Sequence, residues 1–309
     1  MTTPPRDDGV DDEVPKDYGA EFPPEIEPEL LEDEEGEDGE DGEEGEEGEE
    51  GAVGTEEGAE ESGADGDGKP PGKAEEPEEE VKHPDTRVPS LKEMRAALDW
   101  AFEAEDDITP ELLAAFAQHA VLVLEMNRVM NLTTILDPKE VASKHYVDCW
   151  RITRLVPLMA RKVLDLGTGA GFPGIPLAIA EPNLSMTLVD STKKKIDFVD
   201  KVIAKIGIPN AHTVWARAED HLARNKVDVV IVRAVSSVRE NVRTLRKVRH
   251  SLKDLVMLKA ASWSREVRAG EREAERLGFK LDTVWEHELP GDMGSRAILV
   301  YRAPGGAGM

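Results

Sequence analysis

Apolar residues from position 90 onward recur first at helical spacing and only later in short continuous runs. Leu91, Met94 and Leu98 lie on one side of a helix that begins with the capping-box pair Ser90 and Glu93. We expect the helical preface, residues 90–160, to pack against a sheet edge. Its three expected helices run from Ser90 to about Phe102, from Thr109 and Pro110 to about Met126, and from Asp137 and Pro138 onward.

Short apolar runs alternate with helical patterns over residues 161–303. This alternation is typical of an α/β fold with a doubly wound, mostly parallel sheet, here of seven strands. The last two runs flank Pro290 and Gly291 and predict a C-terminal antiparallel hairpin. The expected strands are Val163–Leu166, Met186–Val189, Thr213–Trp215, Val227–Val232, Leu255–Lys259, Phe279–Leu289 and Arg296–Arg302.

A glycine-rich stretch follows the first expected strand. Gly167, Gly169 and Gly171 suit a turn that needs positive φ angles and brings the backbone close to a ligand. Pro173 fits the first turn of the helix that follows, where a missing N–H has no cost. This succession of strand, turn and helix predicts a site for a nucleotide-like cofactor.

The spacing of these glycines distinguishes two kinds of cofactor. A dinucleotide fingerprint needs its third glycine at position 172, but Phe172 stands there and the glycine is at 171. The pattern Asp165-x-Gly167-x-Gly169-x-Gly171 resembles motif I of the class I S-adenosylmethionine (AdoMet) methyltransferases. AdoMet has no pyrophosphate, and its cationic sulfonium and amino acid moiety favour a nearby carboxylate such as Asp165. The stretch therefore predicts an AdoMet site in a Rossmann-like fold.

Charge is distributed very unevenly along the chain. Residues 1–89 hold 36 Asp and Glu against 6 Lys and Arg, whereas residues 90–309 hold 29 against 32. The segment from Glu32 to Glu80 is built of Glu, Asp and Gly and cannot bury enough apolar surface to fold. We expect a disordered acidic tail, residues 1–89, before one methyltransferase domain, residues 90–309. The tail is either a solvating appendage or a polyanion that competes with RNA for a basic face.

One cysteine, Cys149, excludes a disulfide scaffold and a cysteine-based zinc site, and it suits a reducing compartment. No run of 18 apolar residues exists, and the N-terminus lacks the apolar core of a signal peptide. We therefore expect a cytoplasmic protein without membrane segments or a bound metal.

Two polar residues come at the ends of expected strands. Asp190 lies 25 residues beyond Asp165, where an acid that bonds ribose hydroxyls is expected, although a helix N-cap is the alternative. Arg233 follows the run 227–232 and is expected to point into the site, because strand carboxyl ends face the ligand. It would bind the cofactor or guanine O6, and Arg217 is a candidate for RNA backbone.

The segment after Arg233 lacks the Asn/Asp-Pro-Pro-aromatic loop of adenine-N6 enzymes, and no nucleophilic cysteine takes its place. The chemistry must then need neither a covalent nucleophile nor a strong base. Guanine N7 fits, because its lone pair lies in the ring plane and carries no proton. The enzyme would contribute proximity and orientation.

Five sequence segments between about Val121 and Arg302 resemble, in the same order, segments of the ribosomal RNA small subunit methyltransferase G family, also called RsmG or GidB. The resemblance implies a class I methyltransferase fold and AdoMet-dependent N7 methylation of a guanine in 16S rRNA. Ala260 departs from the family, which has glycine after Ala-Leu-Lys. The segments are Asn131-Leu132-Thr133, His145-x-x-Asp148, the stretch from Asp165 to Pro176 with Phe-Pro-Gly-Ile-Pro, Arg217-x-Glu219 and Arg233-Ala234.

The resemblance also implies roles for individual residues. By family transfer, Gly167, Phe172, Ala218, Glu219 and Arg233 contact AdoMet, although Ala218 and Glu219 alone would suggest an ordinary helix start. Asp165, Gly169, Gly171 and Asp190 complete the expected cofactor site. The positioning candidates are Asn131, His145 and Arg233, and the RNA-binding candidates are Arg217, Lys193, Lys194 and Lys195.

Two features of the sequence each allow two interpretations. His145 and Asp148 are three residues apart, so they share a helix face and could hydrogen-bond. They either tie the preface to the core or lie at the mouth of the substrate pocket. Two expected helices, one with Arg239, Arg243, Arg246, Lys247 and Arg249 and one with Arg265, Arg268, Arg272 and Arg276, either coat a solvated surface or contact phosphates.

Three functions remain open from the sequence. The first is an rRNA guanine-N7 methyltransferase, acting as a monomer on 16S rRNA or the small ribosomal subunit. The second is a class I methyltransferase of a protein or small molecule. The third is a binding module that kept the fold without turnover.

Overall fold

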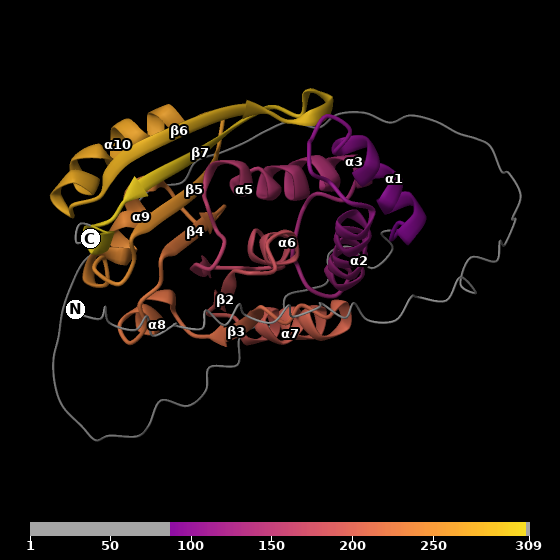
Figure 1. Cartoon of the computed structure of the whole chain (residues 1–309), viewed down its shortest axis with the longest axis horizontal. Helices are drawn as coiled ribbons and strands as arrows, with labels where there is room; N and C mark the ends of the chain where they lie inside the picture. Colours follow the sequence, from indigo (N-terminus) through magenta and orange to yellow (C-terminus); the bar gives the residue numbers. More distant parts are fainter. Residues whose placement is uncertain (1–86, 307–309) are drawn as a thin grey trace, which may run out of the picture. The chain divides into compact units, whose positions relative to one another are not determined.

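The computed structural model describes residues 87–306 (Figure 1). The chain divides into two units, residues 1–72 and 73–309, and all described residues belong to the second. The predicted acidic tail lies outside the described residues except for residues 87–89.

Seven strands form one sheet within residues 87–306, in the order β3-β2-β1-β4-β5-β7-β6. Strands β1 to β5 pair in parallel, and β7 runs antiparallel to both β5 and β6. The predicted mostly parallel seven-stranded sheet with its closing antiparallel hairpin is confirmed. The strands are β1 (Lys162–Leu166), β2 (Ser185–Asp190), β3 (Ala211–Trp215), β4 (Val229–Arg233), β5 (Asp254–Ala260), β6 (Lys280–Glu288) and β7 (Ser295–Arg302).

The sheet is covered on both faces because its strands are apolar at successive positions. Side chains alternate across a strand, so Val163 and Val256 enter one hydrophobic core while Leu164 and Leu255 enter the other. Helices α6 (Gly174–Ala180) and α7 (Lys193–Ile206) cover the first face. The second face is covered by α8 (Ala218–Leu222), α9 (Val238–Thr244) and α10 (Trp263–Arg276).

The preface forms at the predicted helix signals. Ser90 and Glu93 make the capping box of α1 (Leu91–Ala101), and the Thr109 hydroxyl caps α2 (Pro110–Asn127). The third helical segment differs from expectation, because a π-helix interrupts it. It consists of α3 (Pro138–Val141), the π-helix η2 (Ala142–Val147), α4 (Asp148–Trp150) and α5 (Ile152–Leu155).

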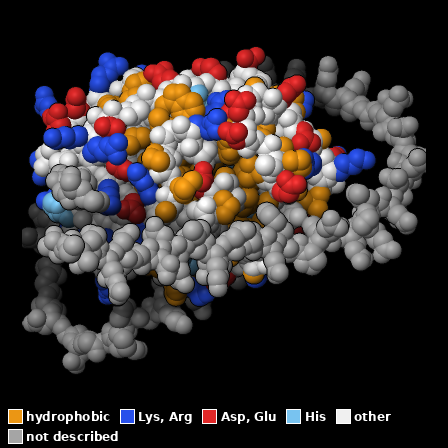
Figure 2. Space-filling view, viewed as in Figure 1, with side chains coloured by type: hydrophobic (Ala, Val, Ile, Leu, Met, Phe, Trp, Pro, Cys, Tyr) orange, Lys and Arg blue, Asp and Glu red, His pale blue; other side chains and the backbone are white. Residues whose placement is uncertain are grey.

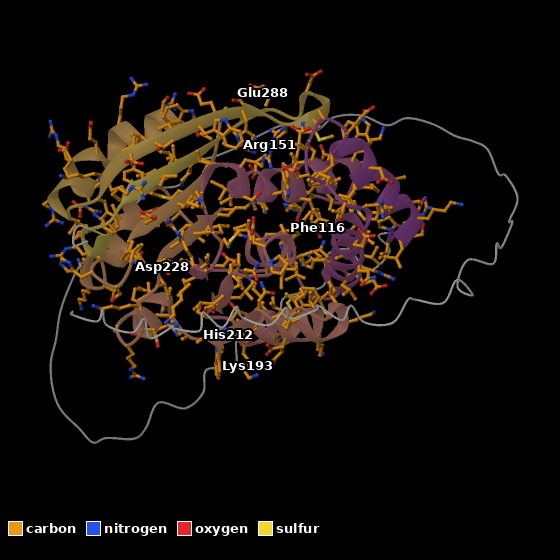
Figure 3. All side chains as sticks on the ribbon, in the orientation of Figure 1. Phe116, Arg151, Lys193, His212, Asp228 and Glu288 are labelled. Carbon is orange, nitrogen blue, oxygen red and sulfur yellow. The ribbon has the colours of Figure 1, made fainter. Side chains whose placement is uncertain are left out.

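The preface packs mainly on helices, so the expectation that it lies against a sheet edge was wrong in the main. Its helix α2 lies against α6 and α7, and α4 lies against α6. It also reaches the sheet, for example at the end of β6, where the Arg151 guanidinium donates to the Glu288 carbonyl at 2.7 Å (Figure 3). Helix α2 is 18 residues long, and it packs against both α6 and α7.

Smaller differences concern segment ends. Pro173 precedes α6 as its N-cap and does not lie in the first turn. The first arginine-rich segment is not one helix, because α9 ends at Thr244 and a 3₁₀ turn, η3 (Leu245–Lys247), follows. Further 3₁₀ turns are η4 (Pro290–Asp292) and η5 (Pro304–Gly306). Among the described helices, none combines the length and apolarity needed to cross a bilayer.

Candidate active site

The glycine loop between β1 and α6 adopts the predicted left-handed backbone. The φ angles of Gly167, Gly169 and Gly171 are 72°, 57° and 97°. The backbone amides of Gly167 and Thr168 donate to the Val189 carbonyl at 2.9 and 3.0 Å, which fixes the loop against β2. The loop therefore lies at the carboxyl ends of two adjacent parallel strands, where α/β proteins bind ligands.

Asp165 lies beneath this loop and is buried. Its Oδ2 accepts from the Thr168 hydroxyl at 2.7 Å and from the Gly174 amide at 2.9 Å, whereas Oδ1 has no hydrogen-bond partner among the described residues. Burial raises the pKa of this carboxyl to about 6, against the opposing effect of the two hydrogen bonds. Asp165 thus holds the loop in shape from below.

Asp190 ends β2 next to the loop. Its Oδ2 accepts from the Gly169 amide at 3.0 Å, and its Oδ1 accepts from the Thr192 amide at 2.8 Å. The carboxylate therefore bonds both the glycine loop and the start of α7. This contact joins two of the predicted cofactor residues directly.

The end of β3 brings the next group of predicted residues to the same sheet edge. Asp190 and Trp215 are register partners, and the Trp215 indole donates to the Ser191 carbonyl at 2.9 Å. Arg217 is the N-cap of α8, and Ala218 and Glu219 are its first residues, as a helix start would place them. The parallel register of β2 and β3 thus brings Asp190, at the end of β2, close to the segment after β3 in which Ala218 and Glu219 begin α8.

His119 holds the glycine loop from the preface, and the sequence analysis missed it. Its Nε2 lies 3.0 Å from the Ala170 carbonyl and its Nδ1 lies 3.0 Å from the Tyr146 hydroxyl. A carbonyl only accepts, so Nε2 carries the proton and Nδ1 accepts from Tyr146. Burial lowers the pKa of His119 to about 4, so the ring is neutral at pH 7. The available signal was its position three residues after Phe116, on the apolar stripe of α2.

Arg233 joins the end of β4 to the preface. Its guanidinium donates to the Lys144 carbonyl at 2.9 Å and to His145 Nδ1 at 2.7 Å. It also lies 3.6 Å from the Asp148 carboxylate and 5.6 Å from the Phe172 ring centre. These contacts place Arg233 between the glycine loop and the π-helix; that it binds a ligand there stays a prediction.

His145 and Asp148 meet through Arg233, and no direct hydrogen bond between them occurs among the described residues. Because Arg233 can only donate, His145 Nδ1 accepts and its Nε2 donates to the Thr133 hydroxyl at 3.0 Å. Burial, and then the Arg233 charge, lower the pKa of His145 well below its usual value. The pair joins the preface to the core, as one of the two interpretations has it, and Asp148 also lines the cavity described below, as the other interpretation has it.

The remaining predicted site residues are the positioning candidate Asn131 and the RNA-binding candidates at the start of α7. Asn131 is exposed, and the loop around it is organised by Asn127, whose Oδ1 accepts from the Leu132 and Thr133 amides at 2.7 and 2.8 Å. Sequence reasoning missed Asn127. Lys193, Lys194 and Lys195 begin α7, and Lys193 pairs with Asp197 near the Trp215 ring (Figure 3).

A cavity of about 460 Å³ opens at the carboxyl ends of β4 and β5. One lining residue, Val235, lies next to the glycine loop, because a Cβ placed on Gly167 would lie 2.9 Å from Val235 Cγ2, whereas the loop residues themselves are not among those that line the cavity. Lys259 pairs with Glu266 at 2.8 Å in its wall. The lining residues are Asp148, Arg233, Ala234, Val235, Ser236, Ser237, Leu258, Lys259, Ala260, Glu266 and Arg296.

One family profile, described as rRNA small subunit methyltransferase G, matches residues 112–290. The chain belongs to this family. The match includes the glycine loop, His119 and Arg233, so the preface from α2 onward is part of the family's shared sequence.

Curated members of this methyltransferase G family align over most of their own length. "Ribosomal RNA small subunit methyltransferase G" of Desulforamulus reducens is 35% identical over 209 residues, which cover 65% of this chain and 86% of the relative. The protein of the same name from Solibacter usitatus is 33% identical over 214 residues, covering 66% and 100%. A solved precorrin-6y C5,15-methyltransferase of Geobacter metallireducens gives a TM-score of 0.40 at 16% identity, covering 56% of this chain and 91% of that one.

Proposed function

We propose that this chain transfers the methyl group of AdoMet to N7 of a guanine in 16S rRNA. The observation that carries the proposal is the cavity lined by Arg233 and Lys259, whose lining residue Val235 lies next to the glycine loop, in a member of this family. A donor on the loop and an acceptor base in the cavity would then be neighbours.

The residues around the loop fit AdoMet. A Cβ at Gly169 would meet only the Gly167 carbonyl at 3.9 Å, so the backbone there is open to a ligand, whereas Gly167 and Gly171 pack against Val235 and Ile175. We propose that Asp190 binds the ribose hydroxyls, since its two oxygens have lone pairs beyond the two amide bonds. Bound AdoMet supplies an electrophilic methyl group on its sulfonium.

The adenine and the amino acid moiety would meet the other predicted residues. Ala218 and Glu219 at the start of α8 would contact the adenine. Asp165 would act on the donor through the loop that it supports, and Phe172 would shape the site, because its ring is stacked 4.6 Å from the His145 ring. Arg233 would contact the donor or guanine O6 from the other side.

The chemistry that we propose needs no proton abstraction. Both ring nitrogens of His119 and of His145 are already engaged, so neither ring is available as a base. Burial raises the pKa of the Cys149 thiol far above its usual range, which makes it a poor nucleophile. Guanine N7 needs only alignment with the methyl group, and such orientation can lower a barrier by roughly 7 to 11 kcal/mol.

We propose that RNA approaches over the arginine side chains of α9 and α10, where Gly270 brings the two helices into contact. Figure 2 shows that Lys and Arg side chains are interspersed with Asp and Glu side chains at this end of the domain. Arg217 and Lys193, Lys194 and Lys195 would contact the backbone farther along the sheet edge. RNA is commonly read in single-stranded loops, so the target guanine would be unstacked into the cavity. We further propose a cytoplasmic monomer with residues 1–89 as an acidic tail.

The test is a methyl-transfer assay on small-subunit rRNA with wild type, Arg233→Ala and the control Arg87→Ala, whose side chain is exposed and outside the proposed site. We expect wild type and the control to form 7-methylguanine, identified by mass spectrometry, and Arg233→Ala to lose at least about 100-fold in kcat/KM, an estimate for one lost charged contact at a reacting centre. Transfer to a protein or small molecule with rRNA left unmethylated would contradict the proposal and favour the other methyltransferase class.

A further inference from the structure

The cavity wall contains one buried acceptor that the fold leaves without a hydrogen bond. Asp148, at the start of α4, lines the cavity with a side chain that is 4% exposed. Its Oδ1 has no hydrogen-bond partner among the described residues. An unpaired buried acceptor costs free energy, so its presence in a cavity wall points to a ligand that donates to it.

The neighbours of Asp148 do not supply that donor. His287 Nε2 lies 3.5 Å from Oδ1, an ion-pair contact that is longer than an ordinary hydrogen bond, and both ring nitrogens of His287 are without a hydrogen-bond partner among the described residues. Arg233 faces the other oxygen, Oδ2, at 3.6 Å.

The second carboxylate of the cavity is already engaged. Glu266 pairs with Lys259 at 2.8 Å and accepts from the Val238 amide at 3.3 Å. The Lys259 ammonium donates in addition to the Ser236 carbonyl at 2.6 Å. Glu266 uses Oε2 for both of its contacts and its side chain is 27% exposed, so Asp148 Oδ1 is the buried carboxylate oxygen of this cavity wall that has no hydrogen bond among the described residues.

We propose that Asp148 recognises the target guanine by accepting from the N1–H and N2 amino edge of the base. This inference rests on the proposed function. Guanine carries these donors on its Watson–Crick edge, whereas N7 lies on the Hoogsteen edge, with O6 between N1 and N7. A base held by its donor edge keeps N7 free to face the glycine loop. Adenine would present an acceptor, its N1, to the carboxylate, and its lone pair would be repelled.

The test uses 16S rRNA ligated to carry either guanine or inosine at the methylated position, presented naked and in reconstituted small subunits. Inosine lacks only the N2 amino group. For wild type we expect kcat/KM on guanine to exceed that on inosine by roughly 10- to 100-fold, the range for a hydrogen bond to a charged group. In Asp148→Ala the ratio should fall to near one, because the partner of the amino group is gone.

Three further measurements separate the outcomes. The control variant Asp282→Ala removes an exposed carboxylate near the start of β6, whereas His287 is near its end. It should keep the wild-type ratio of kcat/KM on guanine to kcat/KM on inosine. AdoMet binding by calorimetry checks that each variant is folded; if Asp148→Ala is not, the isosteric Asp148→Asn must lower the ratio below that of wild type. A wild-type ratio near one, or a ratio that survives in both Asp148 variants, overturns the role of Asp148 alone. No transfer to guanine RNA by wild type overturns the proposed function and this inference with it.

Discussion

His119 and Ala170 are 51 residues apart in the chain, yet the imidazole of one donates to the carbonyl of the other at 3.0 Å. One belongs to the preface and the other to the glycine loop. The loop that we propose as the cofactor site is therefore held on one side by Asp165 and Asp190 of the core and on the other by a helix outside it.

We predict that His119→Leu loosens this loop. The Ala170 carbonyl and the Tyr146 hydroxyl would lose their partner, at a cost of about 1–3 kcal/mol for each buried group. Urea unfolding should show the loss, and calorimetry should show weaker AdoMet binding. His119→Gln, whose amide can still donate, should recover part of both, and the exposed Glu125→Ala should change neither. Unchanged AdoMet affinity in His119→Leu would contradict the loop-holding role.

His119 also predicts a pH dependence. Its pKa is about 4 in the folded protein against 6.5 for the ordinary group. Between these values the unfolded chain binds a proton that the folded protein does not, so stability falls as the pH drops from about 6.5 to about 4, by roughly 3 kcal/mol in all. The advantage of wild type over His119→Gln in unfolding free energy should shrink across this window. Parallel stability curves would show that the ring is not neutral when buried.

Asp165 predicts the opposite trend. Its folded-state pKa of about 6 exceeds the ordinary value of 3.8, so its contribution is fully present below about pH 4 and is lost as the pH rises through about 6. Asp165→Asn should therefore gain on wild type by roughly 3 kcal/mol between pH 4 and pH 7, measured by urea unfolding across that range. If the variant keeps full AdoMet affinity at pH 7, the carboxylate acts only on the loop. A variant that gains nothing over this range would mean that the carboxyl titrates normally.

We predict that Gly171→Ala is far worse than Gly207→Ala, although both residues have positive φ. A Cβ at Gly171 would lie 2.7 Å from Ile175 Cγ1 and 3.2 Å from His119 Nε2, whereas a Cβ at Gly207 meets nothing within 4 Å. Gly207→Ala should cost only the backbone strain, about 1–2 kcal/mol, and leave AdoMet binding intact. Gly171→Ala should add about 1–3 kcal/mol of overpacking and lose AdoMet affinity in calorimetry. Equal effects on AdoMet binding would refute the loop assignment.

The acidic tail allows a test of autoinhibition. If residues 1–85 compete with RNA, their deletion should raise RNA affinity most at low salt, where charge interactions are least screened. A matched chain with the tail's acidic residues replaced by Asn and Gln should behave like the deletion. Identical affinity-against-salt curves for wild type and deletion would leave the tail as a solvating appendage.

The strands and the glycine turn could be predicted because their determinants are local. The apolar run at Val229 to Val232 and the glycines at 167, 169 and 171 lie within single segments. The contacts of His119 and Asn127 could not, because each depends on a partner placed by tertiary packing. The π-helix around His145 also escaped prediction, since a helical period alone does not reveal one extra residue in a turn.

The hydrogen bond between α2 and the glycine loop has a consequence for how this fold can be divided. A fragment beginning at residue 161 would retain every strand of the sheet, yet the Ala170 carbonyl would lose its donor and α6 would lose its cover. The sheet and its helices therefore cannot be transferred alone. In a chimaera with another methyltransferase, the helices before the sheet and the glycine loop must come from the same protein.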